Sequence, residues 1–286
     1  MSIIHCPEAQ TLTLHTDHTT YQMKVGAGGL LLHTYYGPRC EGDMSYLIQY
    51  RDRGFSGNPF DAGMDRTISC DALPLEYPCE GNGDYRQTAF GVRDEQGVSG
   101  CDLRYAGHSI EQGKYALPGL PTVFADAAEA QTLRVELRDE RLPIEVTLLY
   151  GVLPEADCIT RSAIIRNGGK EPLILENAAS TALDTLTGEL DLLHFYGRHA
   201  SERTLERSPI THQEQVIGSR RGTSSHQHNP FVILAEHETN EEHGLCVGLS
   251  LLWSGSFACA AGKDGYDQTR LTLGIQPERF QYHLAP

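Results

Sequence analysis

The most informative stretch of the chain is Ser219-Arg220-Arg221-Gly222-Thr223-Ser224-Ser225-His226-Gln227-His228-Asn229-Pro230-Phe231. Its polar, turn-forming residues lead directly into the apolar run 231–234. Gly, Ser, Asn and Pro favour turns, and a short apolar run bounded by turns is typical of a buried strand. The stretch therefore predicts a polar turn that feeds a strand of the core.

The same alternation of short runs and turns continues on both sides of this stretch. No segment keeps the periodicity of an amphipathic helix, and residues 53–65 and 236–243 are expected to be loops. Asn167-Gly168 lies between two runs and predicts a hairpin, because both residues tolerate positive φ. We expect an all-β chain, a large antiparallel β-sandwich in one domain over residues 1–286. The expected strands are 11–16, 21–25, 30–36, 133–138, 144–150, 159–166, 173–176, 231–235, 245–253, 257–260 and 269–275.

Composition and charge exclude several classes of partner. The formal net charge is −15, whereas phosphate binding needs clustered Lys and Arg, so no nucleic acid is expected. No run approaches the roughly 20 apolar residues of a membrane span, and no basic amphipathic stretch suggests a membrane surface. The start of the chain lacks the pattern of a secretory signal. The 8 cysteines include no Cys-x-x-Cys pair, which favours reduced thiols in a cytoplasmic protein.

Neither a metal nor a phosphate-binding cofactor is predicted. His226 and His228 form an i, i+2 pair, but spacing supplies no third ligand. Gly26-Ala27-Gly28-Gly29 is followed by an apolar run typical of a strand, whereas a phosphate loop depends on a helix N-terminus. We therefore expect a hairpin turn at the glycines, no metal site and no cofactor.

The segment 51–66 is the strongest candidate for binding. It is longer than most connections and concentrates Arg, Asp and aromatic residues. A carboxylate accepts from sugar hydroxyls, a guanidinium donates to them, and an aromatic ring packs on the C–H face. From these residues alone, an ordinary exposed, turn-rich loop with surface charges is the favoured interpretation. For Trp253, the only tryptophan, packing against a sheet is favoured over a role as a sugar platform.

Several further stretches, taken in order with Ser219 to Phe231, resemble the N-terminal domain of the family 36 glycoside hydrolases, the α-galactosidases. Each of them is weak alone, and their collinear order over most of the chain is specific. They are Leu75-Glu76-Tyr77-Pro78, Gly81-Asn82-Gly83-Asp84-Tyr85-Arg86, Asp102-Leu103-Arg104-Tyr105, Gly119-Leu120-Pro121, Ile159-Thr160-Arg161-Ser162-Ala163, Ser254-Gly255-Ser256-Phe257 and Gly274-Ile275-Gln276-Pro277.

The resemblance implies an architecture of three parts, of which this chain matches the first. That part is a galactose-mutarotase-like β-supersandwich, and a catalytic (β/α)₈ barrel and a C-terminal β-domain follow it in the family. The family's nucleophile lies in a Lys-Trp-Asp-like motif of the barrel, and this chain has no Trp-Asp dipeptide. No catalytic residue is therefore assigned. The alternation at Phe280, Tyr282 and Leu284 also leads us to expect that more chain follows residue 286.

The resemblance assigns substrate binding to Asp52 and Arg66. They match the family pattern Arg-x-Phe-Ser-x-Asn-Pro…Asp-Arg-Thr, with Gly57 where the family often has Pro. In tetrameric bacterial members this loop reaches the active site of a neighbouring subunit and binds the terminal galactose. The implied function is that of a non-catalytic domain of an α-galactosidase, active on α-galactosides such as melibiose and raffinose with retention. The implied partners are galactose, bound through the neighbouring subunit, and further copies in a homo-oligomer.

Two other functions stay open from the sequence. A stand-alone sugar mutarotase or epimerase needs a histidine and a carboxylate placed as acid and base; His226 with Glu236 or Glu76 is the pair we consider. A free carbohydrate-binding module is the other alternative.

Overall fold

The computed structural model describes residues 2–54, 58–186 and 188–286. The described residues form eighteen strands and three short 3₁₀-helices, η1 (Ala27–Gly29), η2 (Ser45–Leu47) and η3 (Phe60–Ala62). The predicted all-β class is confirmed. In the described part of the chain, no helix has the length and apolar character needed to cross a membrane.

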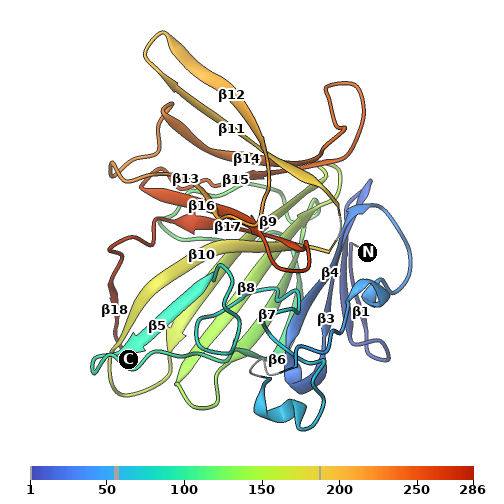
Figure 1. Cartoon of the computed structure of the whole chain (residues 1–286), viewed down its shortest axis with the longest axis vertical. Coiled ribbons are helices and arrows are strands. Elements are labelled where there is room, and N and C mark those ends of the chain that lie inside the picture. Colours follow the sequence, from blue (N-terminus) through green and yellow to red (C-terminus); the bar gives the residue numbers. More distant parts are fainter. Residues whose placement is uncertain (1, 55–57, 187) are drawn as a thin grey trace.

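The described strands form four antiparallel sheets (Figure 1). The N-terminal sheet has the order β1 (Ile3–Cys6), β2 (Thr11–His15), β3 (Thr19–Val25), β4 (Leu31–Pro38), and the second sheet has the order β6 (Arg104–Gln112), β7 (Gln131–Arg138), β8 (Ile144–Leu153), β9 (Cys158–Asn167). The six-stranded sheet has the order β13 (Gln215–Ser219), β16 (Phe257–Lys263), β17 (Thr269–Ile275), β10 (Leu173–Thr185), β18 (Tyr282–Leu284), with β5 (Phe90–Asp94) also paired to β10. The fourth sheet has the order β12 (Ser201–Pro209), β11 (Leu190–Arg198), β14 (His228–Glu236), β15 (Cys246–Ser250).

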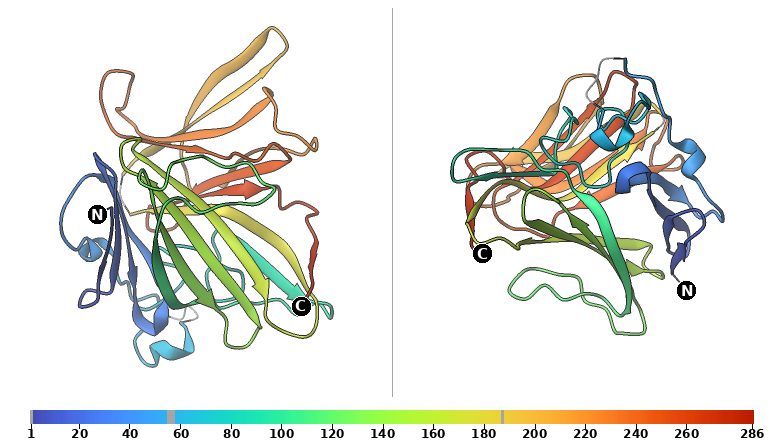
Figure 2. Two further views of the ribbon diagram at one scale, coloured as in Figure 1. Left: turned by 180° about the vertical axis from the view of Figure 1, so that it is seen from behind. Right: turned by 90° about the horizontal axis from the view of Figure 1, so that it is seen from below.

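One large hydrophobic core joins all four sheets. Leu14 of β2, Val135 of β7, Leu271 of β17 and Val232 of β14 each contribute a fully buried side chain. The N-terminal sheet stands beside the second sheet, while the hairpin β11–β12 projects away from the rest (Figures 1 and 2). Residues of β15 alternate between exposed and half-buried, whereas β2 and β17 are buried along almost their whole length, so these two strands bury both of their faces.

Most of the predicted strands are observed, with changes at their ends. Residues 269–275 form β17 as predicted, and the strand after the polar turn begins at His228 rather than at Phe231. The predicted turn at Gly26 to Gly29 is confirmed, because η1 connects the paired strands β3 and β4.

The hairpin predicted at Asn167-Gly168 is wrong. β9 ends at Asn167 and pairs only with β8, while β10 belongs to the six-stranded sheet. The side chain of Asn167 is buried, accepts from the backbone N–H of Gly169 at 2.9 Å and donates to the carbonyls of Glu171 and Leu284 at 2.7 and 3.2 Å. The asparagine therefore stabilises a connection between two sheets. The preference of asparagine for turns suits this connection as well as it would suit a hairpin.

Candidate functional site

The two ends of the candidate loop leave a small hydrophobic cluster that is separate from the main core. Ile48 precedes the loop and Cys70 follows it, and both are buried against Leu30 and Leu32 of the β3–β4 hairpin. Leu73 and Leu75 complete the cluster. Burial of these apolar residues at both ends fixes where the loop leaves the domain.

Asp52 and Arg66 face each other where the loop closes. The backbone N–H of Arg53 donates to the carbonyl of Arg66 at 3.3 Å, and an Arg66 guanidinium nitrogen lies 3.0 Å from Asp52 Oδ1. Asp52 Oδ1 also accepts from the N–H of Gly54 at 2.8 Å, in a turn where Gly54 has φ of 67°. More than half of each charged side chain is exposed, 56% for Asp52 and 58% for Arg66. The two residues predicted to bind substrate are thus brought together, with most of their hydrogen-bonding capacity facing solvent.

The base of the loop is held by a turn from a distant part of the chain. The guanidinium carbons of Arg51 and Arg53 lie 4.5 and 5.0 Å from the ring centre of Tyr266, which belongs to the β16–β17 turn. Arg53 also forms an ion pair with Asp71. Burial alone would lower the pKa of Arg53, but the hydrogen bond with Tyr266 and the charge of Asp71 outweigh it and raise that pKa. These contacts keep Arg53 charged and fix the backbone on either side of Asp52.

The outer part of the loop carries two exposed apolar side chains. Phe60 and Met64 are 92% and 94% exposed. Local hydrogen bonds hold the described residues 58–67 together: Asn58 donates to the carbonyl of Asp65 at 3.0 Å, and Thr67 donates to the Asp65 carboxylate, which lowers the pKa of that group. Phe55, Ser56 and Gly57 of the family pattern lie outside the described residues.

A buried charge network supports the segment that follows the loop. Arg270 of β17 donates to both carboxylate oxygens of Asp184 at 2.7 and 2.8 Å and to Asp84 at 2.7 Å. Arg86 also binds Asp84, at 2.9 and 3.0 Å, and donates to the carbonyls of Cys70 and Leu73. The Gly-x-Gly-Asp-Tyr-Arg stretch therefore serves as an anchor between the sheet and the small cluster.

A second buried network contains Glu76. Its carboxylate accepts from the hydroxyls of Tyr21 and Tyr150 at 2.6 and 2.7 Å and lies 2.7 Å from the Arg161 guanidinium. Burial would raise the pKa of Glu76, but Arg161 and the hydrogen bonds hold it below its ordinary value. Glu76 is thus fully engaged inside the protein.

The structure does not assemble the acid–base pair considered for a mutarotase. His226 lies in the turn before β14 and is exposed, and Glu236 is exposed at the far end of that strand. No hydrogen bond or ion pair joins His226 to Glu236 or Glu76 within the described ranges.

Sequence reasoning missed Asp71, Tyr266 and Arg104 as supports of the loop. Arg104 donates to the carbonyl of Gly28 at 3.0 Å and lies 3.7 Å from Asp61. These contacts join segments far apart in the sequence, so no spacing rule predicts them. The expectation for Trp253 is also wrong, because the residue is exposed and its ring N–H donates to the carbonyl of Ser256 at 3.2 Å.

Comparison with known proteins places this geometry in a family. The family model described as the glycosyl hydrolase family 36 N-terminal domain matches residues 29–285. The bifunctional alpha-galactosidase/sucrose kinase AgaSK of Mediterraneibacter gnavus is 54% identical over 285 residues, which cover 100% of this chain and 30% of that protein. Alpha-galactosidase AgaA of Geobacillus stearothermophilus is 38% identical over 288 residues, 100% of this chain and 39% of that protein.

Solved structures give the same result. The galactosidase domain of AgaSK superposes with a TM-score of 0.97 at 54% identity, over 99% of this chain and 39% of that one. A variant of AgaA in complex with raffinose superposes with a TM-score of 0.93 at 37% identity, over 96% of this chain and 38% of that one. The chain thus spans less than two fifths of the length of these relatives.

Proposed function

The chain belongs to the glycosyl hydrolase family 36 N-terminal domains, and from this membership we propose that it is a non-catalytic part of a retaining α-galactosidase. In the proposed arrangement, a catalytic barrel supplies the two carboxylates of the reaction. This domain supplies Asp52 and Arg66 to the terminal galactose of a substrate such as melibiose or raffinose, in the active site of a neighbouring subunit.

The observation that carries the proposal is the exposed Asp52–Arg66 pair. The carboxylate is an acceptor and the guanidinium a planar set of donors, so together they match adjacent hydroxyls of a neutral sugar. The pair is preorganised because Arg53, Asp71 and Tyr266 brace the backbone beside it. Preorganisation reduces the entropy that a flexible loop would lose when it binds.

Phe60 and Met64 support the homo-oligomer. These almost fully exposed apolar side chains lie on the same loop as the pair, where a neighbouring subunit could bury them. Burial of these side chains against a neighbouring subunit would bring Asp52 and Arg66 to that subunit's active site.

The finer architecture and the location form part of the same proposal. A galactose-mutarotase-like supersandwich is consistent with four antiparallel sheets around one large core. A cytoplasmic location is supported by the 8 cysteines, none of which forms a disulfide in the structure.

The first test is hydrolysis of an aryl α-galactoside by the purified 286-residue chain, compared with the same chain extended by a family 36 barrel. We expect turnover only in the extended protein, because both catalytic carboxylates of the family lie in the barrel. Turnover by the 286-residue chain that co-purifies with it through successive columns would contradict the assignment. A mutarotation assay on the same sample tests the alternative enzyme class.

A further inference from the structure

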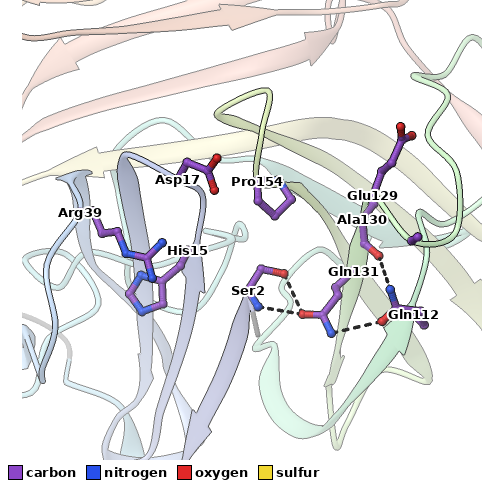
Figure 3. Close-up of a pocket in the computed structure, with 10 residues that line it drawn as sticks. Ser2, His15, Asp17, Arg39, Gln112, Glu129, Ala130, Gln131 and Pro154 are labelled. Atoms are coloured by element: carbon purple, nitrogen blue, oxygen red, sulfur yellow. Dashed lines mark hydrogen bonds between the residues drawn. The ribbon is translucent and has the colours of Figure 1, made fainter.

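A polar pocket of about 320 Å³ lies between the N-terminal sheet and the second sheet, and it shares no residue with the loop of Asp52 and Arg66 (Figure 3). His15 at the end of β2, Asp17 in the β2–β3 turn and Arg39 after β4 line one side. Gln131 of β7 and Glu129 before it line the other side, and Pro154 lies between the two (Figure 3). Its volume suits a ligand of monosaccharide size.

We assign the proton of His15 to one ring nitrogen from the hydrogen bonds of Thr20. The single hydroxyl proton of Thr20 is donated to the carbonyl of Cys40 at 3.2 Å, and the same oxygen accepts from the N–H of Cys40 at 3.1 Å. Thr20 Oγ1 therefore accepts from His15 Nδ1, 2.9 Å away, so that Nδ1 holds the proton and Nε2 keeps a lone pair.

That lone pair belongs to a nearly buried imidazole. The whole residue is 3% exposed. Burial lowers the pKa of His15, with Glu41 opposing and Arg39 reinforcing the shift, so the ring is neutral near pH 7. Nε2 makes no hydrogen bond to any residue in the described ranges, and it is the remaining polar atom of a side chain that lines the pocket. The pocket thus contains a fixed acceptor inside the protein rather than on its surface.

The opposite wall is also held rigid. Gln131 Oε1 accepts from the backbone N–H and the hydroxyl of Ser2 at 3.0 and 2.7 Å, and its amide nitrogen donates to Gln112 at 3.4 Å (Figure 3). Gln112 in turn donates to the carbonyl of Ala127 at 2.8 Å. These bonds orient the side-chain amides before any ligand arrives, which is a property of a built site.

The unused groups of the pocket define the ligand. Asp17 and His15 Nε2 offer acceptors, and Glu129 uses one carboxylate oxygen for the N–H of Asp126 at 2.7 Å and keeps the other. Arg39 donates to the carbonyl of Thr16 at 2.7 Å and lies 3.7 Å from Glu41, and its remaining N–H groups offer donors. Acceptors that outnumber donors match a ligand rich in hydroxyls, because each hydroxyl can donate to one of them. Pro154 supplies apolar surface for a C–H face.

We propose that this pocket is a second carbohydrate site, which binds a neutral hydroxylated ligand of monosaccharide size independently of Asp52 and Arg66. The ligand is either a free monosaccharide or the terminal unit of an oligosaccharide, and the two share the same hydrogen-bonding groups. A ligand of this size has a dissociation constant on the order of millimolar.

The test is titration of the isotopically labelled 286-residue chain with D-galactose and, separately, with raffinose, followed by NMR chemical-shift changes. We expect saturable shifts at residues of the pocket, with Asp17→Ala weakening binding about tenfold because a hydrogen bond to a charged group is lost. Stronger binding of raffinose than of galactose identifies an oligosaccharide end, and the reverse identifies the free sugar. Asp52→Ala is the matched control and should leave these shifts unchanged.

A pair of substitutions tests the role of Nε2. His15→Asn keeps a donor for Thr20 and removes the acceptor, so it should weaken binding about as much as Asp17→Ala; His15→Gln keeps a polar atom near the position of Nε2 and should lose less. Thermal unfolding checks that both His15 variants fold. If they do not fold, the binding measured for Asp17→Ala tests the proposal. Three outcomes would each overturn the proposal. The first is saturation by putrescine but not by either sugar, and the second is no saturable shift with any probe. The third is sugar-induced shifts that vanish in Asp52→Ala and persist in Asp17→Ala.

Discussion

The molecule uses the same chemical pair, aspartate and arginine, in two opposite ways. Asp84 and Arg270 lie 2.7 Å apart, with 0% and 1% of their side chains exposed, while Asp52 and Arg66 lie 3.0 Å apart and are more than half exposed. Distance therefore does not separate the two pairs, but burial and the number of unused hydrogen-bonding groups do. The buried pair is part of the framework, and the exposed pair keeps hydrogen-bonding groups that face solvent.

The energetics follow from that difference. An exposed ion pair contributes about 0–1 kcal/mol, since water competes for both groups. A buried charge that loses its partner is far more costly, because nothing else solvates the remaining charge.

The largest effect is expected for Arg270→Ala. The substitution removes both short hydrogen bonds to the buried carboxylate of Asp184 and leaves Asp84 with Arg86 as its cationic partner, which should lower the free energy of unfolding by about 3–5 kcal/mol. Denaturant unfolding of the 286-residue chain measures it. The matched control is Arg134→Ala, which removes a 2.7 Å ion pair to Glu111 on the surface and should cost about 0–1 kcal/mol. Equal losses of unfolding free energy in Arg270→Ala and Arg134→Ala would contradict the expected difference between buried and exposed ion pairs.

The second largest effect on stability is expected from acidification, which protonates buried carboxylates. Burial opposes ionisation of Asp84, but Arg270 and Arg86 prevail and hold its pKa below the ordinary 3.8, as Arg161 does for Glu76 below 4.5. A lowered folded-state pKa stabilises the fold above the unfolded-state pKa, and this stabilisation is lost as pH falls through the folded-state value. Stability should thus hold from neutral pH to about pH 4 and fall below it, as thermal midpoints across pH would show. Glu76→Gln should flatten that fall, and an unchanged profile in this variant would argue against the role of Glu76.

Asp52→Ala should alter function and leave the fold intact. In the protein that combines this domain with the barrel, loss of a charged hydrogen bond to a galactose hydroxyl should reduce kcat/KM at least about tenfold. The thermal midpoint should change little, because the pair is exposed. Arg66→Ala should act in the same direction. Unchanged kinetics with the oligomer intact would exclude the pair from the sugar site.

The smallest effect on stability is expected for Phe60→Ser combined with Met64→Ser. Both side chains are almost fully exposed in the single chain, so unfolding should shift by no more than about 0.5 kcal/mol. Light scattering of the barrel-containing protein should instead show a smaller assembly. An assembly that is unchanged in size would mean that another surface holds the subunits together.

The strands were the part of the structure most open to prediction. β17 spans residues 269–275 both in the prediction and in the structure, because turn-forming residues bound this run on both sides and six of its seven residues are buried. The pairing of the strands was harder to predict from the sequence. The turn at Asn167 has residues typical of a hairpin, yet it connects strands of two different sheets. A turn sequence records the local backbone, whereas the partner of a strand depends on which surface it buries.

The sequence by itself determined the all-β class, the family and the two candidate residues, Asp52 and Arg66. These follow from local patterns and from the order of short motifs, and both can be read directly from the sequence. Only the tertiary structure decided that Tyr266 braces the loop, that Glu76 and Asp84 are internal anchors, and that His15 presents a lone pair to a pocket. Each of these depends on contacts between residues distant in sequence, and on burial, which sets whether a charged group holds the fold or meets a ligand.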